Sequence, residues 1–279
     1  MAEWARENPW RQGQALSDEA VETLGLINPD ALNTTLAVVI THDCDLAAAP
    51  DKEPGVEVIV GRFVDEVKGD YSHAKNARSL QVKYRRGELA IPVELTATAK
   101  VSIDKRSLAT FTPRDDIKLD THGHAILQAW RAARYRRAAF PDGFEHRLKT
   151  AKLHRKIGRA VEPSGQSIVA IFFDVDGGEE IHREGPDDIY ELGVYLLYDT
   201  TQNEEKAHSD AVKAAEEIEA AFEKEFRTGE GETWKQIKLL YCDVISDQAM
   251  TYAQSRLLKQ WRLEYLSLGD NPPQPMIEE

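Results

Sequence analysis

The chain lacks the features that assign a protein at once to several large classes. Its 279 residues include 2 cysteines, Cys44 and Cys242, which are too few for a disulfide framework and are expected to be buried, reduced thiols. No apolar run approaches the roughly 18 to 20 residues of a transmembrane helix. The first residues, MAEWARENPW, have no basic patch followed by an apolar core, so a secretory signal is not expected either. We therefore expect a cytoplasmic protein that does not enter a membrane.

Several nucleotide-binding and catalytic motifs are also missing. There is no G-x-G-x-x-G, no G-x-x-x-x-G-K-[ST] and no G-x-S-x-G in the sequence. The chain therefore offers no case for a dinucleotide site, a P-loop or a serine hydrolase elbow. What is present is an ordinary globular composition, with 42% hydrophobic and 30% charged residues.

Charge is distributed unevenly along the chain. The net charge of −13 argues against wrapping nucleic acid over the whole surface. However, residues 120–159 hold 10 basic and 3 acidic side chains, whereas residues 160–279 hold 10 basic and 26 acidic ones. This contrast predicts an N-terminal domain over 1–119, a basic helical connector over 120–160 and an acidic C-terminal domain over 161–279.

The pattern of hydrophobic residues gives the fold class. Short β-branched runs, among them TTLAVVIT, GVEVIVGRFV, RSLQVKYR and SLATFTP, predict a small β-barrel or strongly bent sheet in the first domain. A short helix capped by Ser17 precedes them. The last domain reads as strands around one long helix over 205–226, with its apolar residues at helical spacing. We expect an α+β protein whose C-terminal domain is a mostly antiparallel sheet packed with this helix.

The connector is predicted to consist of two helices. Residues 120–140 have helical period, and Pro141 should end the first helix, with Asp142 as the cap of the next. Residues 144–161 then form a second, strongly basic helix. A linker is expected at 162–166.

The stretch THDCD, directly after the first strand, concentrates reactive side chains. Asp43 and Asp45 are carboxylates spaced by one residue at a strand end, a pattern that suits Mg²⁺, with His42 beside them as a catalytic candidate. Zinc is disfavoured because no further cysteine or histidine supplies the ligands. The alternative is a turn in which both carboxylates bind nearby backbone and Cys44 packs inward. Both interpretations stay open, and with them the question of whether the protein is an enzyme.

A second acidic stretch, IVAIFFDVDGG, resembles the first motif of haloacid-dehalogenase-like phosphatases. The resemblance implies a nucleophilic Asp174 and a general acid Asp176. Gly178 stands where that family has threonine, and the chain is too short here for the repeated core of the family. A hairpin turn at DGG between two antiparallel strands fits these residues better.

The basic connector is the leading candidate for binding. Its cations lie among aromatic residues, an arrangement that suits phosphates and stacked bases. Docking of an acidic protein surface and simple solvation are the alternatives. The candidate residues are Trp130, Arg131, Arg134, Tyr135, Arg136, Arg137, Arg147, Lys149, Lys152, Arg155, Lys156 and Arg159.

The pieces VVITHDCDL and RYRRAAFPDGF resemble uncharacterised bacterial proteins found among mobile-element and defence-associated genes. The resemblance implies a bacterial cytoplasmic protein that works with partner proteins, with an antiviral role among the expectations, and it assigns no catalytic residue. We therefore expect an accessory protein that binds nucleic acid or a protein partner through the connector, with oligomerisation left open. A metal-dependent phosphodiesterase or nuclease built on Asp43 and Asp45 is the competing hypothesis.

Overall fold

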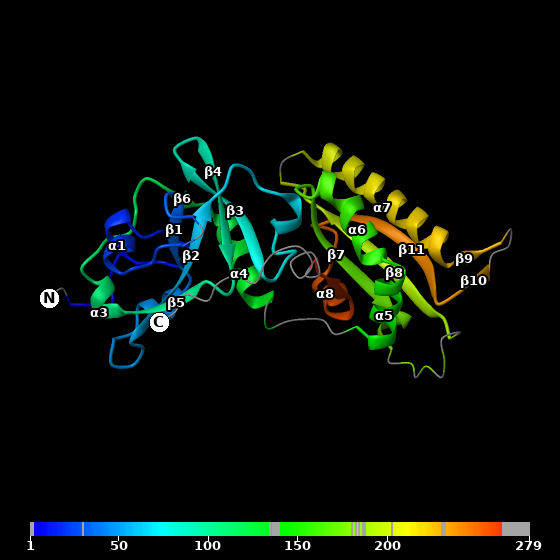
Figure 1. The fold of residues 1–279 in the computed structure, drawn as a ribbon, viewed down its shortest axis with the longest axis horizontal. Coiled ribbons are helices and arrows are strands. Elements are labelled where there is room, and N and C mark those ends of the chain that lie inside the picture. The colour runs from blue at the N-terminus through cyan, green and yellow to red at the C-terminus, as the bar shows by residue number, and fades with distance from the viewer. Residues whose placement is uncertain are drawn as a thin grey trace. The chain divides into compact units, whose positions relative to one another are not determined.

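The computed structural model describes residues 3–263 except 30, 134, 136–139, 180, 182, 184, 186, 187, 202 and 230–232. The chain divides into two compact units (Figure 1). Within the described residues, unit 1 comprises 3–67 and 77–135, and unit 2 comprises 68–76 and 140–263. Unit 2 therefore includes a short segment that interrupts unit 1 in the sequence.

Unit 1 is built on a curled antiparallel sheet, ordered β1-β2-β4-β3-β6, with β5 paired to β2 beside this path. The curl arises because β2 pairs with β5 along its first half and with β4 only at its end. Gly61 stands at this change of partner, where a Cβ atom would lie 2.4 Å from the carbonyl oxygen of Glu94. Only glycine permits so close a strand approach. The elements of unit 1 are α1 (Asp18–Thr23), β1 (Thr35–Val39), α2 (Asp43–Leu46), β2 (Gly55–Phe63), β3 (Ser79–Arg86), β4 (Leu89–Thr96), β5 (Lys100–Asp104), α3 (Lys105–Leu108), β6 (Lys118–Leu119) and α4 (Thr121–Ala133).

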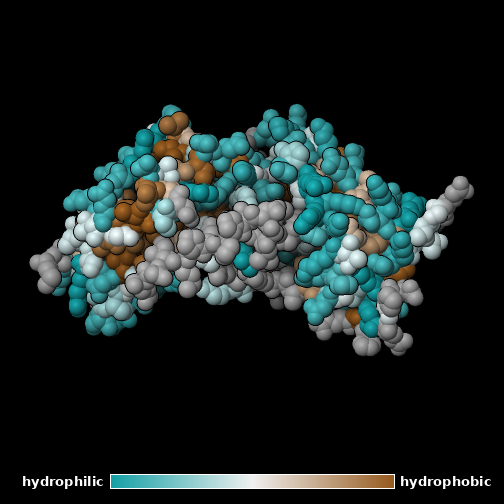
Figure 2. Space-filling view, viewed as in Figure 1, coloured by the Kyte–Doolittle hydropathy of each residue, from teal (hydrophilic) through white to brown (hydrophobic). Residues whose placement is uncertain are grey.

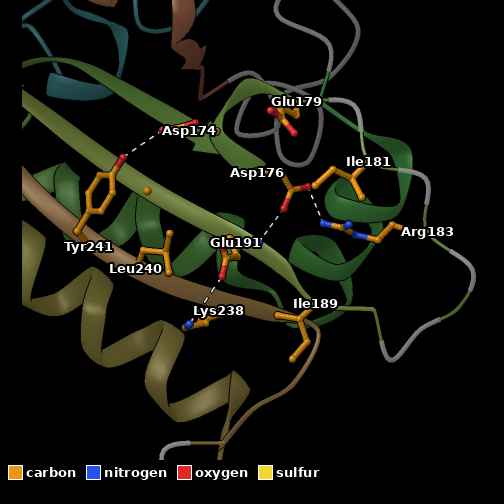
Figure 3. Close-up of a pocket in the computed structure, with 12 residues that line it drawn as sticks. Asp174, Asp176, Glu179, Ile181, Arg183, Ile189, Glu191, Lys238, Leu240 and Tyr241 are labelled. Carbon is orange, nitrogen blue, oxygen red and sulfur yellow. Dashed lines mark hydrogen bonds and ion pairs between the residues drawn. The ribbon is translucent and has the colours of Figure 1, made fainter.

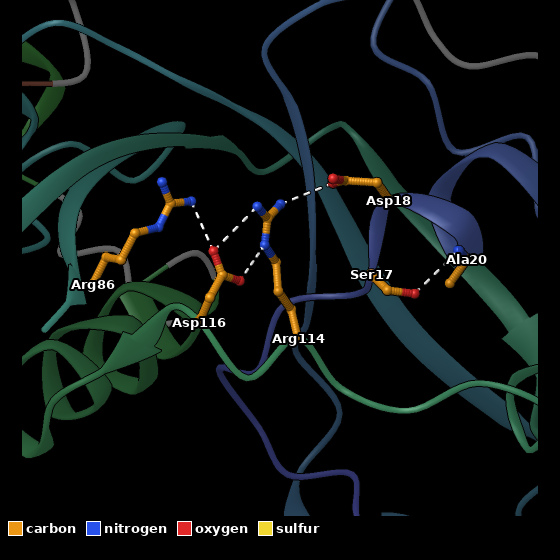
Figure 4. A network of polar contacts seen from close by, with 6 residues as sticks. All are labelled: Ser17, Asp18, Ala20, Arg86, Arg114 and Asp116. Carbon is orange, nitrogen blue, oxygen red and sulfur yellow. Dashed lines mark hydrogen bonds and ion pairs between the residues drawn. The ribbon is translucent and has the colours of Figure 1, made fainter.

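The α+β class and the barrel-like first part are confirmed, with the sheet closing to a half-barrel. The predicted cap is also present, since Ser17 accepts the backbone N–H of Ala20 at 3.3 Å. Nearby, Arg114 joins the first residue of α1 to the loop before β6, through Asp18 and Asp116 (Figure 4). Asp116 also pairs with Arg86 at the end of β3. One predicted strand, SLATFTP, is wrong: Asp104 caps α3 by accepting the Arg106 N–H, and the chain turns after Leu108.

Unit 2 contains a mixed sheet ordered β11-β8-β7-β12. The predicted antiparallel hairpin is confirmed for β7 and β8, with the DGG turn as η3. The prediction of a mostly antiparallel sheet is confirmed, and the one parallel pair is β11 with β8. The long helix α7 makes the crossover that a parallel pair requires. The elements of unit 2 are η1 (Gly69–Tyr71), α5 (Asp142–Thr150), α6 (Leu153–Val161), η2 (Glu162–Ser164), β7 (Ile168–Val175), η3 (Asp176–Gly178), β8 (Tyr190–Tyr198), α7 (Glu204–Phe226), β9 (Arg227–Thr228), β10 (Thr233–Trp234), β11 (Ile237–Ser246), α8 (Tyr252–Leu257) and β12 (Lys259–Trp261).

One face of this sheet is covered by α5, α6 and α7. Alternate strand residues, such as Phe173 on β7 and Val194 on β8, enter the same core as Phe144, Ile157 and Phe222 of the helices. Because strand side chains alternate, Asp174 and Gly193 belong to the opposite face. The outward surfaces of α6 and α7 are mostly hydrophilic (Figure 2).

The inserted segment 68–76 is anchored in unit 2 by a buried lysine. Lys75 is 2% exposed and donates hydrogen bonds to the carbonyl oxygens of Gly165 and Ile168. The segment crosses η2 at a glycine pair, where a Cβ on Gly69 would lie 2.3 Å from the Cα of Gly165. Any larger residue at either position would push the segment away.

The basic region contains a break that the sequence analysis missed. Residues 144–161 do not form one helix, because Lys152 adopts a left-handed conformation with φ of 55° and separates α5 from α6. The cap of α5 is Pro141, whereas the predicted cap, Asp142, is its first helical residue. In the part of the chain that the structure describes, no helix has both the length and the apolar composition needed to cross a membrane.

Candidate polyanion-binding face

The THDCD stretch forms the short helix α2 immediately after β1. His42 caps it, accepting the Cys44 backbone N–H on Nδ1 at 3.3 Å. The carboxylate of Asp43 accepts the backbone N–H of Gln12 at 2.8 Å. The Asp43 carboxylate therefore binds a backbone N–H, as the turn interpretation expects. However, this N–H belongs to Gln12, 31 residues earlier in the chain, and not to the turn itself.

The end of α2 is held by a second buried lysine. Lys105 donates to the carbonyl oxygens of Asp45 at 2.6 Å and Ala48 at 2.8 Å, and its ammonium lies 5.6 Å from the centre of the Trp4 ring. These bonds give the carbonyls at the helix end a cationic donor, in addition to the Ala48 N–H that the Asp45 carbonyl accepts. Cys44 is exposed, so the expectation that it packs inward is wrong; both cysteines are free, and Cys242 is buried.

The structure adds no third metal ligand to Asp43 and Asp45 among the residues that it describes. Among the described residues, no group of three or more histidine, cysteine, aspartate or glutamate side chains could hold a metal ion. Binding of Mg²⁺ at Asp43 and Asp45, with His42 in catalysis, stays a prediction.

The predicted basic connector belongs to both units. Its first helix, α4, lies in unit 1, where Trp130 is 1% exposed and so does not present its ring for stacking on a base. Arg131 forms an ion pair with Glu57 at 2.8 Å. Although burial acts in the opposite direction, hydrogen bonds from Lys100 and Arg131 lower the pKa of Glu57 and so keep it charged. Tyr135 is exposed, and Arg134, Arg136 and Arg137 lie outside the described residues.

Two further cations of the region support the fold of unit 2. Arg147 is buried and donates to the carbonyl oxygens of Gly185, Asp188 and Gln236. Lys156 pairs with Glu225 on α7. Each of these cations has a partner inside unit 2, so neither is available as a free charge.

Four cations remain exposed, and we name this set the basic face: Lys149, Lys152, Arg155 and Arg159. Lys149 pairs with Glu145, a solvent-exposed contact within α5. Lys152, Arg155 and Arg159 form no ion pair with any other residue that the structure describes. Burial first, and then the charges of Arg155 and Lys149, lower the pKa of the neighbouring His154, which indicates a positive local potential.

The left-handed Lys152 positions this face. It turns the chain between α5 and α6 and places its own side chain one turn before Arg155, which is followed one turn later by Arg159. At 1.5 Å per residue, Lys152 and Arg159 are separated by about 10 Å along the helix. That length matches about three phosphate-to-phosphate spacings of one DNA strand, each 3.4 Å along the axis.

Comparisons of the chain with protein-family models, with curated proteins and with solved structures find no match. The resemblance to bacterial mobile-element and defence-associated proteins therefore stays a prediction.

Proposed function

We propose that the protein binds a polyanion, and specifically single-stranded or duplex nucleic acid, through the basic face of α5 and α6. The observation that carries the proposal is that Lys152, Arg155 and Arg159 are exposed in sequence along one short stretch and form no ion pair with another described residue. Exposed cations without an ion pair can bind phosphates, and this binding is favourable because it releases the counterions condensed on the nucleic acid.

The face is small, and this limits the expected strength of binding. Three phosphate contacts give a salt dependence, as log K against log salt, of about −2 to −3. The net charge of −13 opposes approach of a polyanion from other directions. We therefore expect weak binding without base specificity, strongest at low salt, and an accessory role rather than a catalytic one.

The test is a fluorescence anisotropy titration of labelled single-stranded DNA, single-stranded RNA and duplex DNA across about 50 to 200 mM salt. Arg155→Glu/Arg159→Glu should weaken binding at least about tenfold at low salt and reduce the salt dependence by about 2. The matched control is Lys206→Glu/Lys213→Glu, which makes the same change in net charge at exposed positions of α7. Equal losses in both variants, or no binding by the wild type at low salt, would overturn the proposal.

A further inference from the structure

A hollow of about 730 Å³ lies on the face of the unit 2 sheet opposite to α5, α6 and α7 (Figure 3). It is bordered by the end of β7, by η3, by described residues of 179–189 and by the first residues of β8 and β11. The volume falls within the range of about 300–1,000 Å³ found for ligand sites. Its lining combines apolar side chains with carboxylates.

The apolar part of the lining is concentrated. Ile181, Ile189 and Leu240 are 48%, 37% and 47% exposed, and within the described part of unit 2 they are the large hydrophobic side chains that reach this exposure. All three line the hollow. Leu240 owes its position to the register shift between Leu239 and Tyr241, because the extra residue leaves the ladder with β8. Exposed apolar residues that gather at one place mark a binding surface more often than scattered ones do.

The tyrosine at the back of the hollow holds one of the carboxylates in place. The Tyr241 hydroxyl donates to Asp174 at 3.2 Å, and its ring lies over Gly193, where a Cβ atom would come within 2.1 Å of the ring. Gly193 thus makes room for Tyr241 against the sheet. The ring of Tyr195 packs beside it, with centroids 5.1 Å apart.

The charges of the lining are only partly balanced. Asp176 is neutralised by Arg183 at 2.6 Å and also accepts the Glu191 backbone N–H. Glu191 faces Lys238 at 3.7 Å, a long and exposed pair of little strength. Asp174 and Glu179 have no cationic partner among the residues described, so the hollow carries two uncompensated negative charges.

We propose that this hollow binds a peptide segment of a partner protein in which aliphatic side chains alternate with lysine or arginine. The aliphatic side chains would cover Ile181, Ile189 and Leu240, and the cations would pair with Asp174 and Glu179. Nucleic acid is disfavoured here by the same carboxylates. The proposal is independent of polyanion binding, because it uses none of the residues of the basic face.

The probe is a capped hexapeptide of alternating arginine and leucine, titrated into full-length protein with labelled isoleucine and leucine methyl groups. The methyl signals of Ile181, Ile189 and Leu240 should shift, whereas that of Ile27, an exposed residue of unit 1, should not. Matched peptides with glutamate replacing arginine, or serine replacing leucine, should bind at least about tenfold more weakly.

Two variants complete the test. Leu240→Ser and Asp174→Asn/Glu179→Gln should each weaken binding of the arginine–leucine peptide, and Leu89→Ser, at an exposed position of unit 1, should not. Unfolding curves establish that each variant is folded. The methyl shifts of the wild-type protein test the proposal even if a variant does not fold. Uniform shifts across both units, or equal binding of the glutamate peptide, would overturn the proposal.

Discussion

Each unit contains a fully buried lysine, and the two differ in what surrounds them. Lys105 of unit 1 and Lys75 of unit 2 both donate to two backbone carbonyl oxygens. The acceptors of Lys75 are buried, whereas those of Lys105 lie at the partly exposed end of α2. Water could therefore replace Lys105 at its acceptors more easily than Lys75.

The surroundings of the basic side chains also decide which of them are available for binding. Lys75, Lys105 and Arg147 are held by carbonyl oxygens inside their units, while Arg155 and Arg159 on α6 have no such acceptor among the residues that the structure describes. A basic residue that donates to buried carbonyl oxygens supports the fold, and only the cations left exposed are candidates for recognition. Counting basic residues along the sequence cannot separate these two roles.

Replacing the two lysines by methionine should have the largest effect and should separate them. Lys75→Met leaves the buried Ile168 carbonyl without its lysine donor and leaves the Gly165 carbonyl with the Ser72 hydroxyl alone, so the free energy of unfolding should fall by about 2–4 kcal/mol at pH 9. Lys105→Met should cost about 1–2 kcal/mol, because water reaches its acceptors. Urea unfolding followed by circular dichroism measures both; a larger loss for Lys105→Met would contradict the comparison.

The stability of unit 2 should also depend on pH through Lys75. Burial lowers the pKa of Lys75 to about 7 from an ordinary value of 10.5, with Asp70 acting in the opposite direction. Between these values the unfolded chain binds a proton that the folded chain lacks, so stability increases as pH rises from about 7 towards 10.

Below pH 7 the lysine is charged in both states, and its desolvation lowers stability in full. The wild type should gain about 2–3 kcal/mol relative to Lys75→Met between pH 7.5 and 9.5. The difference between the two proteins removes the titration of other groups from the comparison. Parallel pH profiles for wild type and variant would show that Lys75 is not the titrating group.

The sequence predicts the helices and strands of this protein better than it predicts which side chains form ion pairs. Hydrophobic period locates α7 and most of the strands, because these depend on neighbouring residues. Pro141 marks the start of α5, but the prediction that it ends the preceding helix is wrong, since α4 ends at Ala133. The break at Lys152 is invisible, since a left-handed lysine has no signal of its own. The role of the basic face in binding stays a prediction, and the sequence does not show that Arg131 pairs with Glu57, 74 residues away, or that Lys156 pairs with Glu225, 69 residues away. Partners this distant in the chain become visible only in the fold.

The hollow of unit 2 illustrates the same limit. In the sequence, Asp174 and Asp176 resemble a phosphatase motif. In the structure they lie on an antiparallel hairpin, and Asp176 forms an ion pair with Arg183. The apolar residues beside them come from two separate segments, of which β11 contributes Leu240 through its bulge. The pattern of the sequence could have indicated Ile181 and Ile189 as exposed only if the strand ends had been known.

A smaller effect is expected from the carboxylate near Lys75. Asp70 is partly buried, which raises its pKa, and its charge favours the protonated form of Lys75. Asp70→Asn should therefore lower the pKa of Lys75, and the pH-dependent gain in stability should begin at a pH lower by less than about one unit. Unfolding curves collected between pH 5.5 and 8 would detect the change, and an onset displaced to higher pH would refute it.

The smallest effect should come from the turn that Lys105 closes. Asp43→Ala removes one hydrogen bond, from the Gln12 N–H, and should cost about 0.5–1.5 kcal/mol. Because that bond holds Asp43 as a structural acceptor, the loss should be the same with and without Mg²⁺. Thermal unfolding in both conditions measures it, with Asp45→Ala as the matched variant whose carboxylate lacks the Gln12 contact. If Mg²⁺ stabilises the wild type and neither variant, the two carboxylates share a metal ion, and α2 belongs with the recognition sites of the molecule rather than with its structural turns.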